Sequence, residues 1–242
     1  MIHIDKFCLT YNNPLKRGLM MRKFAQLNWQ VRIMEGVPAQ DSVRSPPPDQ
    51  VAQAQMTGRW DPHAWSVMQG HMCMLETYVQ EGTAPYVIIM EDDILIRRDI
   101  NDHLPKIMHD FDLCGLDLLM LGYLTPEPVH MMNTKYPIIN QVFTLHTYPF
   151  NVYGTQMYVM TRSHAEWLVR NFGYESGWHQ SVLPTSQSYA ADWLITKTGK
   201  TACVYPLLAV EQSGGGTSYK DQEQTEFHDL CHTSQYDAAI HI

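Results

Sequence analysis

The sequence is poor in cysteine, in charge and in long apolar runs. Its five cysteines are scattered, odd in number and free of any CxxC pair, which disfavours a disulfide scaffold or a zinc knuckle and indicates a reducing compartment. Charged residues make up only 17%, too few for long disordered tails. No apolar run approaches the ~20 residues of a membrane span, and no basic segment followed by an apolar one opens the chain as in a signal peptide. We therefore expect a cytoplasmic protein with no membrane span.

A basic excess is also missing. Lys and Arg total 17 against 25 Asp and Glu, which gives a formal net charge of −8. Proteins that bind the nucleic-acid backbone normally carry clustered positive charge, so we expect no nucleic-acid partner. An anionic ligand held by a metal ion or by a few arginines remains compatible with this balance.

Hydrophobic periodicity predicts an α/β fold. A strand over 4–11, a helix over 15–28 and a strand over 31–37 form a strand–helix–strand opening, which is typical of an α/β sheet. The helix over 163–173 is expected to begin after an N-cap at Ser163 and to stop at Gly173. The remaining expected elements are helices over 62–82, 101–111 and 189–199 and strands over 86–90, 116–122, 155–161 and 201–211.

Three segments lack a clear period. Residues 38–62 contain three consecutive prolines and little apolar content, and we expect a long mobile loop there. Residues 123–150 are irregular and aromatic, which favours a loop or small hairpin near a site. Residues 213–242 are expected to form a polar C-terminal tail. The length and the 45% apolar content fit one domain over residues 1–242.

Three adjacent carboxylates follow the apolar strand 86–90. Glu91, Asp92 and Asp93 interrupt two apolar runs in the stretch YVIIMEDDILI, and an unpaired buried charge costs several kcal/mol. The strand is apolar on both faces, so we expect it to be central, and ligands in α/β sheets bind beyond the carboxyl ends of strands. Strand alternation would put Glu91 and Asp93 on one side and Asp92 on the other. A hard divalent cation with a ligand phosphate would relieve the repulsion; a solvated turn is the alternative.

The strand-end EDD motif resembles the acidic metal motif of family-25 glycosyltransferases, the lipopolysaccharide-type and collagen-type sugar transferases. Other stretches match that family in order over residues 4–213: NPLKRGLMMRKFAQL, VRIMEGV, MQGHMCMLETYV, LDLLMLGY, GTQMYVMTRSHAEWLV, AADWLI and VYPLLAVEQS. The sequence departs from the family at Gly70, where the family has a serine before the histidine, and in the proline-rich stretch 45–48. These departures concern the donor more than the fold.

The resemblance implies a single Rossmann-like nucleotide-sugar transferase domain of the A type, with a mixed central sheet flanked by helices. It implies an inverting hexosyl- or pentosyltransferase, dependent on Mn²⁺ or Mg²⁺, that moves a sugar from a nucleotide-diphosphate sugar, a UDP-sugar first of all, to a glycan acceptor. It assigns Asp192 as the general base and Asp93, Glu91 and His228 as metal ligands. Donor contacts are implied for Thr10, Arg17, Arg22, His71, Glu91 and Asp92.

Each assignment has a structural alternative. Asp192 can be a simple first-turn acid, His71 a hydrogen-bonded core histidine, and Arg22 part of a solvated helix face. His232 is as good a late histidine as His228.

Two further features bear on the acceptor. Gly154 and Thr155 could let the backbone approach an acceptor sugar. Tyr123, Tyr148 and Phe150 could stack on sugar rings or pack in the core.

Two other functions stay open at this point. A metal-dependent phosphoester hydrolase would use the same acidic cluster with an activated water, and it would need a richer set of His and Asp residues at spaced strand ends. A sugar-binding protein with an inactive transferase fold is compatible with Gly70 and the unusual loop.

Overall fold

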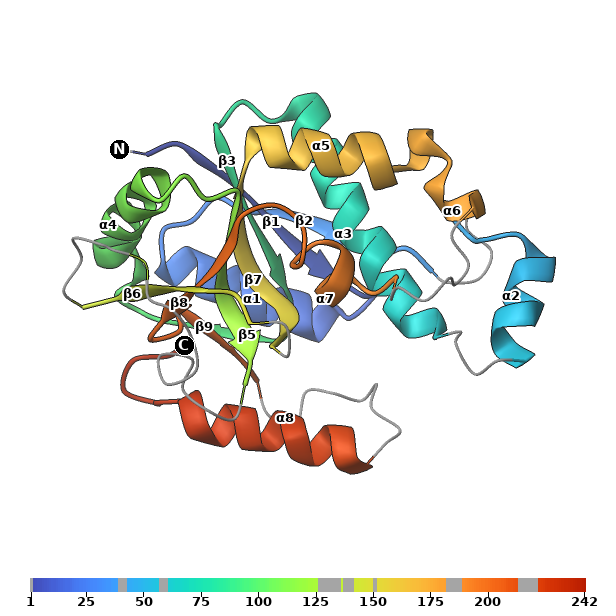
Figure 1. The fold of residues 1–242 in the computed structure, drawn as a ribbon. Coiled ribbons are helices and arrows are strands. Elements are labelled where there is room, and N and C mark those ends of the chain that lie inside the picture. Colours follow the sequence, from blue (N-terminus) through green and yellow to red (C-terminus); the bar gives the residue numbers. More distant parts are fainter. Residues whose placement is uncertain are drawn as a thin grey trace.

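Figure 1 shows a central sheet with helices on both sides and a C-terminal helix against one edge of the molecule. The structure is a computed structural model of the whole chain. It describes residues 2–38, 43–56, 61–125, 136, 142–149, 152–181, 189–212 and 222–242. No helix within these residues is both long and apolar enough to cross a bilayer.

The central sheet is mixed, as expected. The strands are β1 (Ile4–Thr10), β2 (Arg32–Glu35), β3 (Tyr86–Glu91), β4 (Ile94–Ile96), β5 (Leu118–Leu124), β6 (Thr144–Thr147), β7 (Tyr153–Thr161), β8 (Thr201–Tyr205) and β9 (Ala209–Glu211). Seven of them pair in the order β2-β1-β3-β7-β5-β8-β6, while β4 and β9 form a separate antiparallel pair. In the large sheet, β7 and β6 run against the other five strands. The strand that carries the acidic motif, β3, lies inside the sheet.

The helices begin and end where local sequence signals place them. They are α1 (Pro14–Gln26), α2 (Pro48–Met56), α3 (Pro62–Glu81), α4 (Ile100–Leu113), α5 (Arg162–Phe172), α6 (Trp178–Ser181), α7 (Ala191–Leu194) and α8 (Gln222–Gln235), with a 3₁₀ turn at Tyr174–Ser176. Asn13 and Asp61 cap α1 and α3, each followed by a proline at the first helical position. The N-cap of α5 is Thr161, which accepts from the His164 amide, and not Ser163 as predicted. Gly173 ends α5 as expected.

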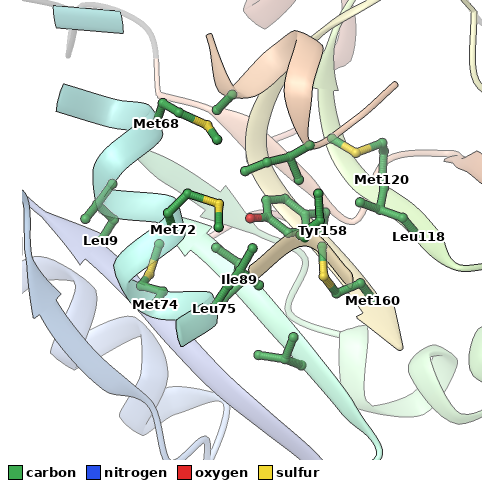
Figure 2. Close-up of a cluster of buried hydrophobic side chains, with 14 of the residues drawn as sticks. Leu9, Met68, Met72, Met74, Leu75, Ile89, Leu118, Met120, Tyr158 and Met160 are labelled. Atoms are coloured by element: carbon green, nitrogen blue, oxygen red, sulfur yellow. The ribbon is translucent and has the colours of Figure 1, made fainter. Parts of the chain in front are cut away.

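Two hydrophobic layers cover the two faces of the sheet. Val87 and Ile89 of β3 pack toward α3, α5 and α7, whereas Ile88 and Met90 pack toward α1 and α4. Figure 2 shows the first layer, in which Ile89 and Tyr158 lie between methionines of α3 on one side and Met120 and Met160 on the other. Because neighbouring strand residues face opposite layers, this alternation continues into the acidic motif.

Two expectations about irregular segments need correction. Residues 38–62 are not loop throughout, because Pro48–Met56 forms α2, with Pro48 starting the helix and Asp49 in its first turn. The segment 213–242 is polar, but its residues Gln222–Gln235 form α8.

The predicted strand over 201–211 is two strands. Pro206 interrupts it, so that β8 stays in the large sheet. The strand β9 pairs instead with β4, the short strand that directly follows the acidic motif. The helix predicted over 189–199 is shorter than expected, with a helical core of Ala191–Leu194. Of the segment 123–150, the structure describes 123–125, 136 and 142–149, and in these residues β6 pairs with β8 at the sheet edge and not with β5.

Candidate functional site

A cleft of about 740 Å³ opens at the carboxyl end of β3. The strand β7 runs antiparallel to its two neighbours, β3 and β5. It therefore begins at the edge of the sheet where β3 and β5 end. The start of α3, the helix α7, the end of β9 and the helix α8 supply the other walls. The cleft therefore lies where the sheet order places a ligand site.

The acidic motif divides between two sides of the sheet. Glu91 and Asp93 line the cleft. Asp92 faces α1, where its Oδ2 accepts from the Thr10 hydroxyl at 2.7 Å and its Oδ1 lies 3.6 Å from the Lys16 ammonium. Strand alternation predicted this division, and the structure confirms it. Thr10, predicted to contact the donor, is buried and instead holds Asp92.

Glu91 is held from behind by a buried chain of hydrogen bonds. Its Oε1 accepts from the Thr155 hydroxyl at 2.6 Å and lies 3.2 Å from Nε2 of His71, whose Nδ1 lies 2.9 Å from the Tyr158 hydroxyl. A neutral imidazole that donates from Nε2 accepts at Nδ1 from the tyrosine. Burial raises the pKa of Glu91, but the contacts with His71 and Thr155 outweigh it and hold the pKa below its usual value.

His71 does not reach the cleft. Its side chain is fully buried behind Glu91, in the position that the core-histidine alternative predicts. The structure therefore gives His71 the task of orienting Glu91, in place of the predicted donor contact.

Asp93 is placed in the opposite way. Its Oδ1 is buried and has no hydrogen-bond partner among the described residues. Burial raises its pKa to about 8, and the nearby Glu91 and Glu211 carboxylates add to the rise. The Lys16 ammonium, 4.0 Å away, offsets only part of this.

Glu211 is a cleft carboxylate that the sequence analysis missed. It ends β9, opposite Ile94 of β4, and the amide of the following Gln212 donates to the Asp93 carbonyl at 2.6 Å. Its Oε2 lies 2.6 Å from Nδ1 of His228 on α8, and both side chains line the cleft. The signal was present, since Glu211 closes the apolar run LLAV much as Glu91 closes VIIM.

The two late histidines are now distinguishable. His228 lines the cleft, whereas His232 contacts the backbone carbonyl of Glu211 at 2.8 Å. The predicted His228 is therefore the one that lines the same cleft as Glu91 and Asp93.

Asp192 lies in the first turn of α7 but does not cap it. The N-cap residue of α7 is Ala190, which has no side-chain cap, and the Asp192 carboxylate accepts from the Gly154 amide of β7. It lines the cleft with Glu91 and Asp93. Burial and the Glu91 charge raise its pKa, while the Gly154 hydrogen bond opposes the rise.

The predicted arginines lie elsewhere. Arg17 and Arg22 are exposed on α1 and are not part of the cleft wall. Lys16 and Lys23 on the same helix face the motif instead, with Lys23 Nζ donating to the Ile94 carbonyl at 2.6 Å. Their seven-residue spacing on one face with buried Met20 was the available signal.

Of the aromatic residues predicted to stack on sugar rings, the two that the structure describes do not line the cleft. Tyr123 is buried in β5 and donates to the Val204 carbonyl at 2.9 Å. Tyr148 packs against the Lys197 ammonium, 4.0 Å from its ring, away from the cleft, and Phe150 lies outside the described residues. Tyr153 lines the cleft, together with the predicted Gly154 and Thr155.

The side chains that line the cleft include atoms that suit a hard cation, although they do not form a complete set of metal ligands. Glu91, Asp93 and Glu211 present oxygen ligands and His228 a nitrogen. Within the described part of the chain, no three His, Cys, Asp or Glu side chains converge closely enough to hold one ion. This arrangement fits Mg²⁺-type binding, in which one or two carboxylates share the ion with ligand phosphates.

Comparisons with known proteins assign no family. No protein-family model matches the chain, and no curated protein matches it. Among solved structures it is similar to a mannose-1-phosphate geranyltransferase from Thermus thermophilus (10% identity, 83% of this chain and 73% of that one, TM-score 0.44) and an inositol-1-phosphate CTP transferase from T. maritima (10%, 96% and 79%, 0.39). It is also similar to a glycosyltransferase involved in glycosylation of the PBCV-1 major capsid (10%, 74% and 76%, 0.33). Likeness at this level assigns no activity, and the mixed α/β class rests on the strand order itself.

Proposed function

We propose that the protein is an inverting, divalent-metal-dependent glycosyltransferase that moves a sugar from a nucleotide-diphosphate sugar to a hydroxyl of a glycan acceptor. The supporting observation is Asp93, whose Oδ1 has no partner among the described residues in a cleft that also holds Glu91 and Glu211. A positive ligand would relieve the burial and crowding that disfavour ionised Asp93. Mn²⁺ or Mg²⁺ accompanied by a diphosphate supplies that charge.

Asp93 and Glu91 would hold the cation, and His228, paired with Glu211, would complete its surroundings. When bound, the cation neutralises charge that develops on the leaving diphosphate. Lys16, which already faces Asp92 and Asp93, adds a fixed positive charge behind the site.

Asp192 is the proposed general base. It lies on a different element from the acidic motif, and its raised pKa makes it a stronger proton acceptor than an ordinary aspartate. In a single displacement it takes the proton from the acceptor hydroxyl as that oxygen attacks the anomeric carbon and the bond from this carbon to the diphosphate oxygen breaks, releasing the nucleoside diphosphate. No enzyme nucleophile is needed, so the configuration inverts.

The nucleotide and the sugars come from the family resemblance, with a UDP-sugar as the first candidate. Isothermal titration calorimetry against UDP-, GDP- and dTDP-sugars, with and without Mn²⁺, tests the donor. We expect micromolar binding that needs the metal and is lost in Asp93→Ala. A folded protein that binds none of the nucleotide sugars would contradict the proposal.

A second pair of variants separates binding from turnover. We expect Asp192→Ala to keep donor affinity and to lose on the order of 10²–10⁴-fold in turnover, the usual worth of general acid–base catalysis. Asp49→Ala, at the exposed first-turn acid of α2, is the matched control and should keep both. Equal turnover in Asp192→Ala and the control would remove Asp192 from the mechanism.

The His228–Glu211 pair favours one alternative. A histidine 2.6 Å from a carboxylate in a cleft can activate water, as a phosphoester hydrolase requires. Incubation of a bound nucleotide sugar without acceptor distinguishes the two functions. Release of nucleotide that is abolished in His228→Gln and retained in Asp192→Ala would favour hydrolysis, whereas acceptor-dependent release favours transfer.

A further inference from the structure

The strand β7 carries a bulge at the cleft. Leu124 of β5 pairs with Tyr153, and Gly122 pairs with Met157. One residue of β5 therefore faces three residues of β7, Gly154 to Gln156. Extra residues of this kind bend a strand and redirect side chains, which explains why consecutive Thr155 and Gln156 both line the cleft.

Gly154 is required by this arrangement. Its φ is +100°, a conformation that disfavours any residue with a Cβ, and a Cβ there would collide with the Gln156 amide. Its own amide donates to Asp192. The bulge therefore places both the Gln156 carboxamide and the Asp192 carboxylate next to one glycine.

Gln156 has an unmet hydrogen-bonding capacity. The side chain is only 5% exposed, and its Oε1 is buried with no partner among the described residues. Buried polar atoms in folded proteins are almost always paired. An amide oxygen accepts only from a donor, so neither a diphosphate nor an ionised carboxylate satisfies it, whereas a sugar hydroxyl does.

We propose that Gln156 is a specificity-determining residue that accepts a hydrogen bond from an acceptor hydroxyl adjacent to the one facing Asp192. The site then selects a sugar with two neighbouring free hydroxyls, one for Gln156 and one for Asp192. That the hydroxyl facing Asp192 is the attacking group rests on the proposed function. Tyr153, at the start of the same bulge, lines the cleft and presents a ring that a pyranose can pack against.

Saturation-transfer NMR with methyl glycosides of glucose, galactose and mannose tests this binding without any turnover. We expect at least one glycoside to bind, and its monodeoxy analogue lacking one of two neighbouring hydroxyls to bind on the order of tenfold more weakly, the worth of one lost hydrogen bond. Gln156→Leu should lose the same factor and should no longer distinguish the glycoside from its deoxy analogue.

Gln69→Leu is the matched control, because Gln69 is a buried glutamine of α3 outside the cleft wall. It should bind the glycoside and discriminate the deoxy analogue as the wild type does. The deoxy comparison on the wild type decides the question even if Gln156→Leu fails to fold. Failure of every glycoside to bind, equal binding of all deoxy analogues, or unchanged discrimination in Gln156→Leu would overturn the inference. Glycoside binding without nucleotide-sugar binding would uphold it and reject the proposed function.

Discussion

Glu91 and Asp93 line the same cleft two residues apart, yet their surroundings treat the two charges in opposite ways. Glu91 is the last residue of β3 and meets Thr155 from the neighbouring strand and His71 from the covering helix. Asp93 follows the strand end, where its Oδ1 finds no partner among the described residues and other carboxylates lie close. The pKa of Glu91 is lowered and that of Asp93 is raised to about 8.

The difference shows how one site can contain both a carboxylate that stabilises the fold and a carboxylate that favours ligand binding. A carboxylate with satisfied partners stabilises its surroundings and keeps its position. A carboxylate left unsatisfied destabilises the empty protein and gains from a cation. We interpret Glu91 as the fixed part of the site and Asp93 as the part that a ligand completes.

The largest effect is expected from removing the support of Glu91. His71→Ala takes away contacts to both Glu91 and Tyr158 and leaves a cavity inside the first hydrophobic layer, so we expect a loss of about 2–4 kcal/mol in the free energy of unfolding. Urea denaturation measures it. Tyr158→Phe, which removes only the hydroxyl, should cost about 1 kcal/mol. An unchanged free energy of unfolding in His71→Ala would show that the contact between His71 and Glu91 does not stabilise the fold.

The second prediction compares the two acids as neutral amides over a range of pH. An ordinary aspartate has a pKa of 3.8, so between about pH 4 and pH 8 the unfolded chain loses the Asp93 proton before the folded protein does, and stability falls as pH rises. Asp93→Asn removes this penalty and should raise the melting temperature at pH 8, by roughly 2–4 °C per kcal/mol, with little change at pH 4.

Glu91→Gln should behave in the reverse sense. The stabilisation from ionised Glu91 is present above its unfolded pKa of about 4.5 and is lost as pH falls through its lowered folded value. The amide variant should therefore melt below the wild type at pH 7, and the gap should close in acid. Thermal melts that shift in the same direction for both variants would refute the contrast.

Addition of the cation should act through Asp93. On the proposed function, Mn²⁺ at about one hundred times its dissociation constant stabilises the wild type by about 2.7 kcal/mol. Asp93→Asn should lose most of this shift in a thermal-melt titration. Mg²⁺ should act in the same way and Ca²⁺, which prefers more ligands, less. An equal Mn²⁺ shift in the variant would place the metal elsewhere.

The smallest effect is expected from the lysine behind the motif. Lys16→Met removes a partly exposed charge from beside Asp92 and Asp93 and should cost about 0.5–1 kcal/mol. Arg17→Met, one residue along the same helix on an exposed position, should be neutral. Urea melts of the two variants that coincide would show that Lys16 contributes nothing to holding the carboxylates.

Local sequence pattern predicted most of the secondary structure and the position of the acidic motif at a strand end. The strand before the acidic motif, the helices that start at Pro14 and Pro62, and the opposite directions of Glu91 and Asp92 all follow from periodicity and capping, which depend on neighbours a few residues away. Errors arose where a proline or a cap competed with the pattern, as at Pro206, Pro48 and Thr161.

The remainder of the site depends on contacts between distant parts of the chain. The sequence by itself determined that a carboxylate cluster ends a buried strand in an α/β sheet. The tertiary structure alone decided that Glu211 joins it through β4–β9 pairing, that Lys16 rather than Arg17 faces it, that His71 supports Glu91 from within, and that the β7 bulge turns Gln156 into the cleft. Periodicity reports which side of an element is buried, but strand pairing and helix packing determine what each buried side chain meets.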